Sequence, residues 1–386
     1  MDGTIPSALM VVGGGPVGTA AAIGLAKAGL PVRLLEARPA LRAQDRRTLA
    51  LTQGSHDLLK GLGAWPGSEV TPIDEIHVSQ RGAWGHTLLD DKDGQGGPLG
   101  YVLLYNTLMA CLGDVASEVP GLTIETGAEV TEVRPGLDAA EVIWRQGDRL
   151  ERAVTPLVLV ADGGRGLTAQ VFGAPREKAY TQEALVAHVE LDRQAVGRAY
   201  ERFTPEGPIA LLPMGDRYTL VWTGTRSETE VRLGWPEPLF LQRLQQAFGD
   251  RAGNFLRVQA RNSFPLSLRV LPSLTRPHCV AIGNAAQTMH PVAGQGLNMG
   301  LRDAADVIHL VGSAEKATLG SAEQLEAYVT ARRRDRRWGI AMTHSLVTLF
   351  SNNWPVLSHG RSLGLAVMSA LPWTRRALTR VMSYGF

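Results

Sequence analysis

The sequence predicts an α/β protein in which an antiparallel β-sheet interrupts the main domain and a helical segment follows it. Three observations predict this fold class. Within the first 36 residues, a short apolar strand, a glycine-rich turn, a helical pattern and a second strand follow one another. Residues 181–265 change to successive β-type segments, and residues 277–300 return to the strand, turn and helix start of the first region. A chain of 386 residues is long enough for two such domains.

The first turn has the glycine spacing of a dinucleotide-binding βαβ unit. The apolar strand Ala8–Val12 runs into GGGPVG, and the helical pattern TAAAIGLAKAG follows. The second strand, PVRLLE, ends in Glu36 about 20 residues later, where a carboxylate can accept hydrogen bonds from both ribose hydroxyls. A carboxylate favours FAD or NAD over NADP here, and an ordinary glycine turn is the alternative. The residues expected to bind the cofactor are Gly13, Gly15, Pro16, Val17, Gly18, Glu36 and Ala37.

A second turn, near the other end of the chain, completes this nucleotide site. The strand candidate His278–Ile282 leads into GNAAQTMHPVAGQGLNMG, and a helix is expected from about Gly296 onward. Glycines at 294 and 296 let the backbone approach a flat ring, and the helix start presents unpaired N–H groups. Such a turn suits the negative charge of a reduced flavin. The residues expected to contact the cofactor are Gly283, Asn284, Pro291, Gly294, Gln295, Gly296, Leu297 and Asn298.

A second acidic residue, in addition to Glu36, stands at the end of a third strand candidate, TPLVLVA. This strand ends in Asp162 and Gly163. Because ligands of open α/β sheets bind at the carboxyl ends of the strands, we expect both residues to contact the cofactor.

The remaining pattern divides the chain further. An arginine-rich loop ends at Arg47, helices are expected at 53–62 and 101–112, the latter after a short apolar strand, and strands are expected at 122–133 and 141–144. We therefore expect a discontinuous cofactor domain, a substrate domain and a C-terminal helical segment. Their expected ranges are 1–75, 101–180 and 276–337 for the cofactor domain, 76–100 and 181–275 for the substrate domain, and 338–386 for the C-terminal segment.

Composition excludes several other classes of protein. The net charge is +2, and no basic block with interleaved aromatic residues indicates nucleic-acid binding. The nine histidines are scattered without metal-ligand spacing, and Cys111 and Cys279 are isolated, so neither a metal site nor a disulfide framework is expected. No Lys or Arg precedes Lys27 and no stretch has 18 uninterrupted apolar residues, so neither a signal peptide nor a membrane span is expected. The chemistry is therefore expected to come from an organic cofactor.

These motifs, in this order, resemble those of the flavin-dependent aromatic hydroxylases and, within them, of the ubiquinone-biosynthesis hydroxylase family. The most specific match is HPVAGQGLNMGLRD at 290–303. DRRTLAL at 45–51 and AYERFTPEGPIALLPMGDRYTLVW at 199–222 also look familial, so the resemblance spans nearly the whole chain. It implies a Rossmann-like FAD-binding domain of the aromatic-hydroxylase type with an inserted antiparallel-sheet substrate domain.

The resemblance also implies a reaction. NADH or NADPH reduces FAD, O₂ adds to form a flavin C4a-hydroperoxide, and its distal oxygen is transferred to the ring of a prenylated phenol. By family position, Arg47 meets the FAD pyrophosphate, Asn106 lies near the flavin, and the substrate side is lined by Pro291, Leu212 and Pro213. His290 is the candidate general base, although a His-Pro pair that only shapes the turn is the stronger alternative.

The sequence departs from the family pattern at several positions. Asn284 replaces a frequent Asp, and Gln287 replaces a frequent His, which is similar to the branch that acts on 2-polyprenyl-6-methoxyphenol. Gly166 and Ala169 replace a Ser and an Arg in a motif thought to touch both FAD and NAD(P)H. A partner protein is therefore a second candidate source of the electrons that reduce FAD. The alternative functions are a related FAD oxidoreductase that acts on another lipid or aromatic, and a flavin-binding scaffold among the ubiquinone-synthesis proteins.

The C-terminal segment is unusual in charge. Between Trp338 and Phe386 it has no acidic residue, four arginines and long apolar runs. Basic side chains next to apolar ones suit the surface of an anionic bilayer, so we expect a cytoplasmic protein that attaches peripherally to the inner membrane. A helical layer packed on the core, or a homodimer contact, is an equally supported alternative.

Overall fold

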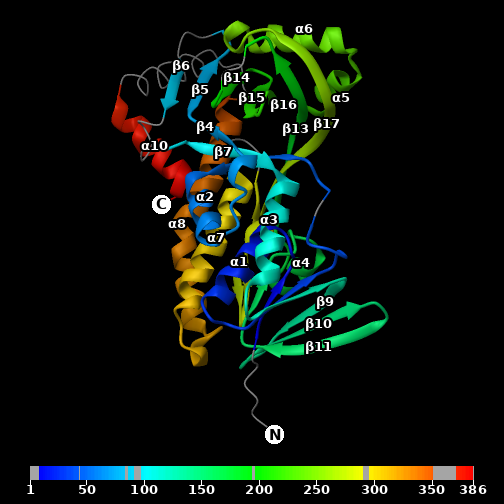
Figure 1. The fold of residues 1–386 in the computed structure, drawn as a ribbon, viewed down its shortest axis with the longest axis vertical. Coiled ribbons are helices and arrows are strands. Elements are labelled where there is room, and N and C mark those ends of the chain that lie inside the picture. The colour runs from blue at the N-terminus through cyan, green and yellow to red at the C-terminus, as the bar shows by residue number, and fades with distance from the viewer. Residues whose placement is uncertain are drawn as a thin grey trace.

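A computed structural model of the chain describes residues 8–42, 44–82, 86–90, 97–193, 196–289, 295–350 and 371–385. Figure 1 shows two halves on either side of the strands β4 and β7. The lower half holds a mostly parallel sheet with helices packed on it, and the upper half is built on a large, mainly antiparallel sheet. The α/β fold with an inserted antiparallel sheet is confirmed.

The parallel sheet has six strands in the order β18-β19-β12-β1-β2-β8, with β18 running antiparallel at one edge. β1 is buried along its whole length, because it lies in the middle of this sheet. The strands are β1 (Leu9–Val12), β2 (Val32–Glu36), β8 (Leu122–Thr126), β12 (Val158–Val160), β18 (Thr275–Arg276) and β19 (Cys279–Ala281).

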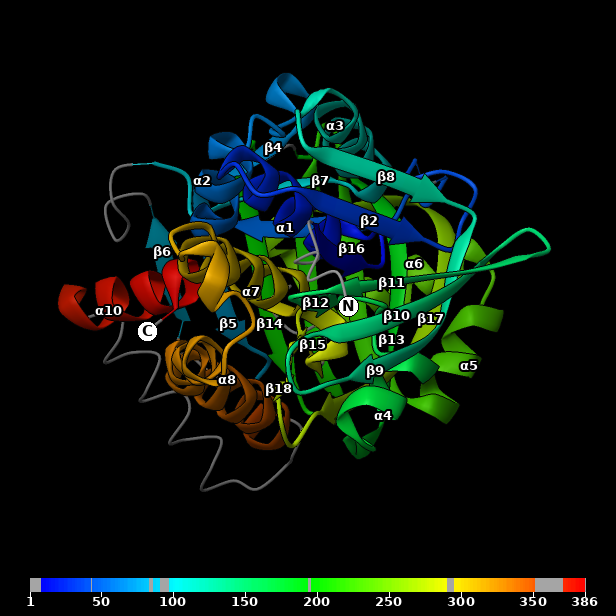
Figure 2. The same cartoon turned by 90° about the horizontal axis from the view of Figure 1, so that it is seen from below.

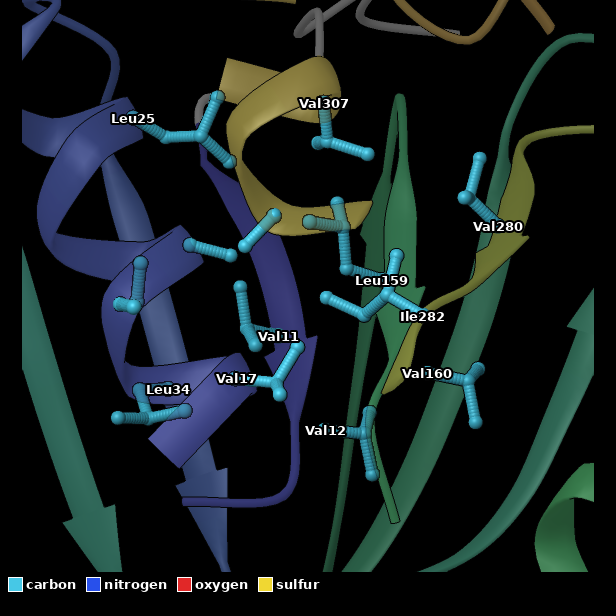
Figure 3. Close-up of a cluster of buried hydrophobic side chains, with 14 of the residues drawn as sticks. Val11, Val12, Val17, Leu25, Leu34, Leu159, Val160, Val280, Ile282 and Val307 are labelled. Carbon is cyan, nitrogen blue, oxygen red and sulfur yellow. The ribbon is translucent and has the colours of Figure 1, made fainter. Parts of the chain in front are cut away.

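Helices α1 (Pro16–Lys27) and α7 (Gln295–Gly312) pack against each other on this sheet. Small residues on α1 permit a close approach: a Cβ atom at Gly24 would lie 2.3 Å from Cδ1 of Ile308 on α7. Figure 3 shows side chains of the central strands and of both helices meeting in one apolar core, among them Val11, Leu159 and Val307. This core fixes the starts of both helices beside the carboxyl ends of the strands.

Further elements surround the parallel sheet. Helix α3 (Tyr105–Glu118) packs on α1, and the long α8 (Ala322–Phe350) packs on α7. A separate sheet of β9 (Ala128–Pro135), β10 (Ala140–Gln146) and β11 (Arg149–Thr155) lies across the lower end, in the foreground of Figure 2. The other helices here are α2 (Gln53–Gly61), α4 (Gly166–Phe172), α10 (Pro372–Tyr384), η1 (Gly67–Glu69), η4 (Gly283–Ala285) and η6 (Lys316–Thr318).

The large sheet has eight strands in the order β20-β17-β13-β16-β15-β14-β5-β6. β5 joins it through a parallel pairing with β14, so a segment before residue 100 completes a sheet formed mostly after residue 175. Its strands and accompanying helices are β5 (Glu75–Gln80), β6 (His86–Asp90), β13 (Arg176–Leu191), β14 (Arg198–Thr204), β15 (Gly207–Met214), β16 (Arg217–Thr225), β17 (Phe255–Val270), β20 (Gln287–Thr288), α5 (Arg226–Gly234), α6 (Glu237–Phe248) and η3 (Asp250–Ala252).

The two faces of this sheet have different neighbours. One face is covered by α6, whose Phe240 and Leu244 are fully buried against it. We call the other face the inner face. On it, Leu212 of β15 packs near a small three-stranded sheet. The strands of this small sheet are β3 (Thr48–Thr52), β7 (Gly100–Leu104) and β4 (Thr71–Ile73). The inner face therefore looks toward the half that contains the nucleotide motifs.

One expectation about secondary structure was wrong, and two helices were not predicted. The segment expected to be helical from residue 101 continues as β7 to Leu104, because its residues pair with β3, and α3 begins at Tyr105. The inserted region also contains α5 and α6, which the strand-like pattern did not indicate. Thr225 and Glu228 form a capping box at the start of α5, and their spacing was the signal in the sequence that could have indicated this helix. The domain boundaries remain a prediction.

Candidate FAD site

Three sequence motifs meet at the carboxyl ends of β1, β12 and β19. A Cβ atom at Gly13 would lie 2.4 Å from the carbonyl oxygen of Ala161, which follows β12. A Cβ atom at Gly164 would lie 2.7 Å from the carbonyl oxygen of Asn284, which follows β19. Turns that are more than 100 residues apart in the sequence are thus in backbone contact, as expected for one ligand site.

The first turn leaves a helix start free for a phosphate. Gly18 must lack a side chain, because its Cβ would lie 2.0 Å from the carbonyl oxygen of Gly13, whose φ is +106°. A Cβ at Gly15 would meet no protein atom within 4 Å. Gly15 is the N-cap of α1 without a side-chain hydrogen bond, and Pro16 occupies the first turn beside the buried Val17. The free N–H groups of this turn form a suitable site for a pyrophosphate.

Glu36 ends β2 directly beside this turn. Its carboxylate accepts hydrogen bonds from the backbone N–H of Gly14 at 2.6 Å and from the backbone N–H and Nε of Arg38 at 2.8 and 2.9 Å. Burial alone would raise the pKa of Glu36, but the hydrogen bonds and charge of Arg38 outweigh it, and the pKa is lowered. Glu36 is therefore ionised and held in place, and the exposed Ala37 follows it. The role of Arg38 was not predicted.

The second motif forms a tight turn at the start of α4. Asp162 accepts hydrogen bonds from the backbone N–H groups of Gly164, at 2.9 Å, and Thr168, at 3.2 Å, and from the Thr168 hydroxyl. Gly163 has a φ of +80°, and a Cβ there would meet no protein atom within 4 Å. Asp162 thus shapes the turn, while Gly163 presents an open backbone edge. Gly166 is the first residue of α4.

The loop at residues 45–47 rests on the start of α3 and brings two predicted residues together. The carbonyl oxygen of Arg47 accepts from the N–H of Tyr105 at 2.9 Å, and that of Asp45 accepts from the N–H of Asn106 at 3.1 Å. The Arg47 guanidinium lies 4.3 Å from the Tyr105 ring centroid and pairs with Asp45 at 3.2 Å. The Asn106 side chain accepts from the N–H of Thr107 at 3.0 Å.

The third motif is described in part. His290, Pro291 and Gly294 lie outside the described residues. Gly283 is buried in the turn η4, Asn284 is exposed, Gln295 is buried at the start of α7, and a Cβ at Gly296 would meet no protein atom within 4 Å. Leu297 is half-buried and packs on the core.

Asn298 has well-defined protein partners. Its Oδ1 accepts from the N–H of Thr52 at 2.9 Å and from the Ser55 hydroxyl at 2.7 Å, and its Nδ2 donates to the carbonyl oxygen of Ala50 at 2.9 Å. The buried side chain therefore joins α7 to β3 and α2. A direct contact of this side chain with a cofactor remains a prediction.

A buried ion network behind the third motif was not predicted. Asp303 accepts from the N–H of Gly283 at 2.9 Å, from Nε2 of Gln287 at 2.9 Å and from Nε of Arg332 at 2.6 Å. Arg332 also pairs with Asp306 at 3.0 Å and with Asp335 at 2.8 Å. Burial raises the pKa of Asp303 although Arg332 opposes that shift. The charged run 332–337 was the available signal in the sequence, but a charge run usually faces solvent.

The two predicted substrate-side residues of β15 lie on opposite faces of their strand. Leu212 is on the inner face, where it packs near Ile73 and Val102. Pro213 is paired with Tyr218, which belongs to the cluster under α6, so its ring points to the other face. The expected contact of the Leu212 carbonyl with a substrate, and the place of Pro213 beside it, remain predictions.

Near Leu212 on the inner face, His188 lies on β13 opposite Thr219, whose hydroxyl is 2.7 Å from that of Thr48. Burial, followed by the charges of Arg217 and Arg46, lowers the pKa of His188. Among the described residues, no group bonds its buried Nδ1. His188 is thus a neutral imidazole with one unused polar atom, and the sequence did not single it out.

The residues present fit FAD. The open backbone at Gly15 and the free start of α1 suit the pyrophosphate, and the ionised Glu36 suits the ribose. Gly163 and Gly296 leave open backbone edges at the other two motifs. The part of the chain that the structure describes contains no group of three His, Cys, Asp or Glu side chains that could hold a metal ion.

Comparisons with known proteins agree with this geometry. The model of the FAD binding domain family matches residues 7–343. Ubiquinone hydroxylase UbiL of Rhodospirillum rubrum is 33% identical over 382 residues, which cover 96% of this chain and 88% of the relative. The 3-demethoxyubiquinol 3-hydroxylase of Escherichia coli is 28% identical over 375 residues, with coverages of 93% and 94%.

Solved structures show the same fold at lower identity. The p-nitrophenol 4-monooxygenase PnpA from Pseudomonas putida superposes with a TM-score of 0.79 at 18% identity, covering 97% of this chain and 96% of that chain. CabE, an aromatic hydroxylase from angucycline biosynthesis, has a TM-score of 0.73 at 20% identity, covering 98% of this chain and 76% of that chain. The chain therefore belongs to the FAD-binding aromatic hydroxylases, within the ubiquinone-biosynthesis hydroxylase family, and is an FAD-dependent monooxygenase.

Proposed function

We propose that this monooxygenase hydroxylates the ring of a polyprenylated phenol, of the 2-polyprenyl-6-methoxyphenol type, in ubiquinone synthesis. The observation that carries the proposal is the 33% identity with ubiquinone hydroxylase UbiL over nearly the whole chain. The apolar residues of the inner face, such as Leu212, support it because a phenol with a long tail needs an apolar surface beside the cofactor. The stretch GNAAQT at 283–288, with Asn284 and Gln287, is similar to the branch that acts on the methoxyphenol, and it favours that substrate over other ring patterns.

Each part of the site then has a task. The start of α1 at Gly15 binds the pyrophosphate, and Glu36 accepts hydrogen bonds from the ribose. The first turn of α7, which is open at Gly296, would present backbone N–H groups to the bound flavin and would stabilise negative charge on it. When bound, FAD supplies the chemistry by which O₂ and two electrons from NAD(P)H yield a ring hydroxyl and water.

The network around Asp303 supports this arrangement from behind. By bonding the N–H of Gly283, Asp303 fixes the turn that follows β19, and by pairing with Arg332 it anchors that turn to α8. Asp303 and Arg332 are positioning residues, and they hold the start of α7 in place.

We also propose that α10 rests on an anionic membrane surface. Its Trp373 is 67% exposed, and Arg376 and Arg380 are exposed on a helix without acidic residues. Both views show α10 at an outer edge, on the opposite side from α5. None of the described helices is long and apolar enough to cross a membrane.

The first experiment measures flavin content and anaerobic reduction of the purified protein. NADH and NADPH are added with and without a short-chain prenylated methoxyphenol, and air is then admitted. We expect bound FAD, faster reduction with the phenol, and hydroxylated product after oxygenation. Bound FAD that neither nucleotide reduces would indicate electrons from a partner or a flavin-binding scaffold, and reduction without a hydroxylated phenol would indicate another substrate.

A further inference from the structure

The part of the chain that the structure describes covers the inner face of the large sheet incompletely. Side chains on the helix-covered face of the same strands, such as Leu185, Leu211 and Leu220, are 0% exposed. On the inner face, Ala199 and Phe203 are buried as well, but six other apolar side chains keep intermediate exposure although their strands are not at the edge of the sheet. These half-buried residues are Ile76, Val78, Val186, Ala210, Leu212 and Val221. We call them the apolar strip.

Glu201 lies within this strip. It is paired with Ala210 on one side and with Val78 on the other, so its side chain shares their face. Its neighbour Tyr200 points the opposite way, into the cluster under α6, where it makes an edge-to-face contact with Phe248 at a centroid distance of 5.9 Å. Because side chains alternate between the two faces along β14, the carboxyl group of Glu201 lies on the inner face.

The carboxyl group of Glu201 has no protein partner. No residue that the structure describes forms a hydrogen bond or an ion pair with it. Other glutamates of this sheet are paired, as Glu75 is with Arg198 and Glu190 with Arg217. The Glu201 side chain keeps intermediate exposure, but its carboxyl group is surrounded by protein. A desolvated carboxyl without a donor is unfavourable unless a ligand supplies one.

The surroundings of Glu201 contain few charged groups. The adjacent strands β5 and β15 present apolar residues to it, with Gln80 at the end of the β5 row. The titratable groups of the inner face, His188, Glu190 and Arg217, lie at its other end, on β13 and β16. Burial is therefore almost the sole cause of the pKa shift of Glu201, and it raises this pKa to about 7.

We propose that Glu201 binds the phenolic hydroxyl of the substrate and accepts its proton, while the apolar strip holds the start of the prenyl tail. This inference rests on the proposed function. In the step, the phenol O–H bond breaks, its proton passes to the Glu201 carboxylate, and the electron pair stays on the oxygen as a phenolate. The ring becomes more nucleophilic toward the transferred oxygen, and the proton can return to the product. A carboxyl that titrates near neutrality is suited to this task.

The test measures binding and oxygen transfer separately as functions of pH. A short-chain prenylated methoxyphenol is titrated into FAD-loaded protein between pH 5.5 and 8.5, and the flavin absorbance gives the Kd. In the wild type, we expect binding to strengthen as pH rises through about 7, because the ionised carboxylate is the stronger acceptor. In Glu201→Gln, we expect a flat pH profile, a Kd about tenfold higher at pH 8, and oxygen transfer slower by about 100-fold.

Glu190→Gln is the matched control, since it removes a glutamate that is on the same face but paired with Arg217. We expect it to keep the wild-type pH profile. The inference is overturned if Glu201→Gln, with its FAD content and circular dichroism intact, keeps the wild-type profile and rate, or if both variants lose the profile equally. If the wild type binds no phenol at any pH, the proposed function fails, and this inference fails with it.

Discussion

The Oδ2 atom of Asp303 accepts a hydrogen bond of 2.9 Å from the backbone N–H of Gly283. This bond joins the third turn of the cofactor site to α7, and Arg332 anchors the same carboxylate to α8 at 2.6 Å. The turn therefore depends on an ion pair whose two side chains are 2% and 3% exposed. Removing one partner of such a pair leaves an uncompensated buried charge.

We expect Asp303→Ala to lower the free energy of unfolding by about 3–5 kcal/mol and to weaken FAD binding. Arg332 would lose the carboxylate that also orients Gly283, although Asp306 and Asp335 remain beside it. Urea unfolding and flavin content measure the two effects. Arg333→Gln is the control, since this neighbouring arginine is 56% exposed and its pair with Glu326 is 3.6 Å long. Equal stability of the two variants would contradict the role of the network.

Gly15 and Gly18 should respond differently to the same substitution. Gly15→Ala adds a Cβ into open space, so the fold should stay intact while the pyrophosphate loses its close approach, and the Kd for FAD should rise about tenfold or more. Gly18→Ala places a Cβ 2.0 Å from the carbonyl oxygen of Gly13, so it should destabilise the apoprotein by about 2–3 kcal/mol. Apoprotein unfolding and FAD titration separate the two. An unstable Gly15→Ala apoprotein would contradict the assignment of that position to a ligand.

The titration of Glu201 should make stability depend on pH. Its pKa rises from 4.5 to about 7 on folding, so the protonated form is favoured in the native state. Stability is therefore greatest below pH 4.5 and is lost as pH rises through 7, by about 3 kcal/mol at most. We expect Glu201→Gln to be more stable than the wild type at pH 8, and the advantage to shrink toward pH 5. Urea unfolding at both pH values checks this, and an advantage that does not change with pH would contradict it.

Local patterns predicted the elements that bind the nucleotide. Glycine spacing and Glu36 place the first βαβ unit because backbone sterics determine where only glycine fits. The start of α3 was misplaced because pairing of residues 100–104 with β3 overrides their helical pattern. The partners of Asp303, the unpaired carboxyl of Glu201 and the unbonded nitrogen of His188 depend on strands and helices that are distant in sequence. A single sequence does not show such contacts.

The C-terminal helix gives the last prediction. If α10 lies on a membrane, its exposed Trp373 enters the interface while Arg376 and Arg380 meet anionic headgroups. We expect the protein to sediment with vesicles that contain anionic lipid at low salt, and Trp373→Ser combined with Arg376→Gln to release it. Leu137→Ser is the control, because Leu137 is 95% exposed in the turn between β9 and β10, and Figure 1 shows these strands on the opposite side of the molecule from α10. Binding that survives loss of the α10 side chains, or that is equally reduced by Leu137→Ser, would assign membrane contact to another surface. Absence of vesicle binding in the wild type would leave packing on the core, or contact with a second subunit, as the role of the segment.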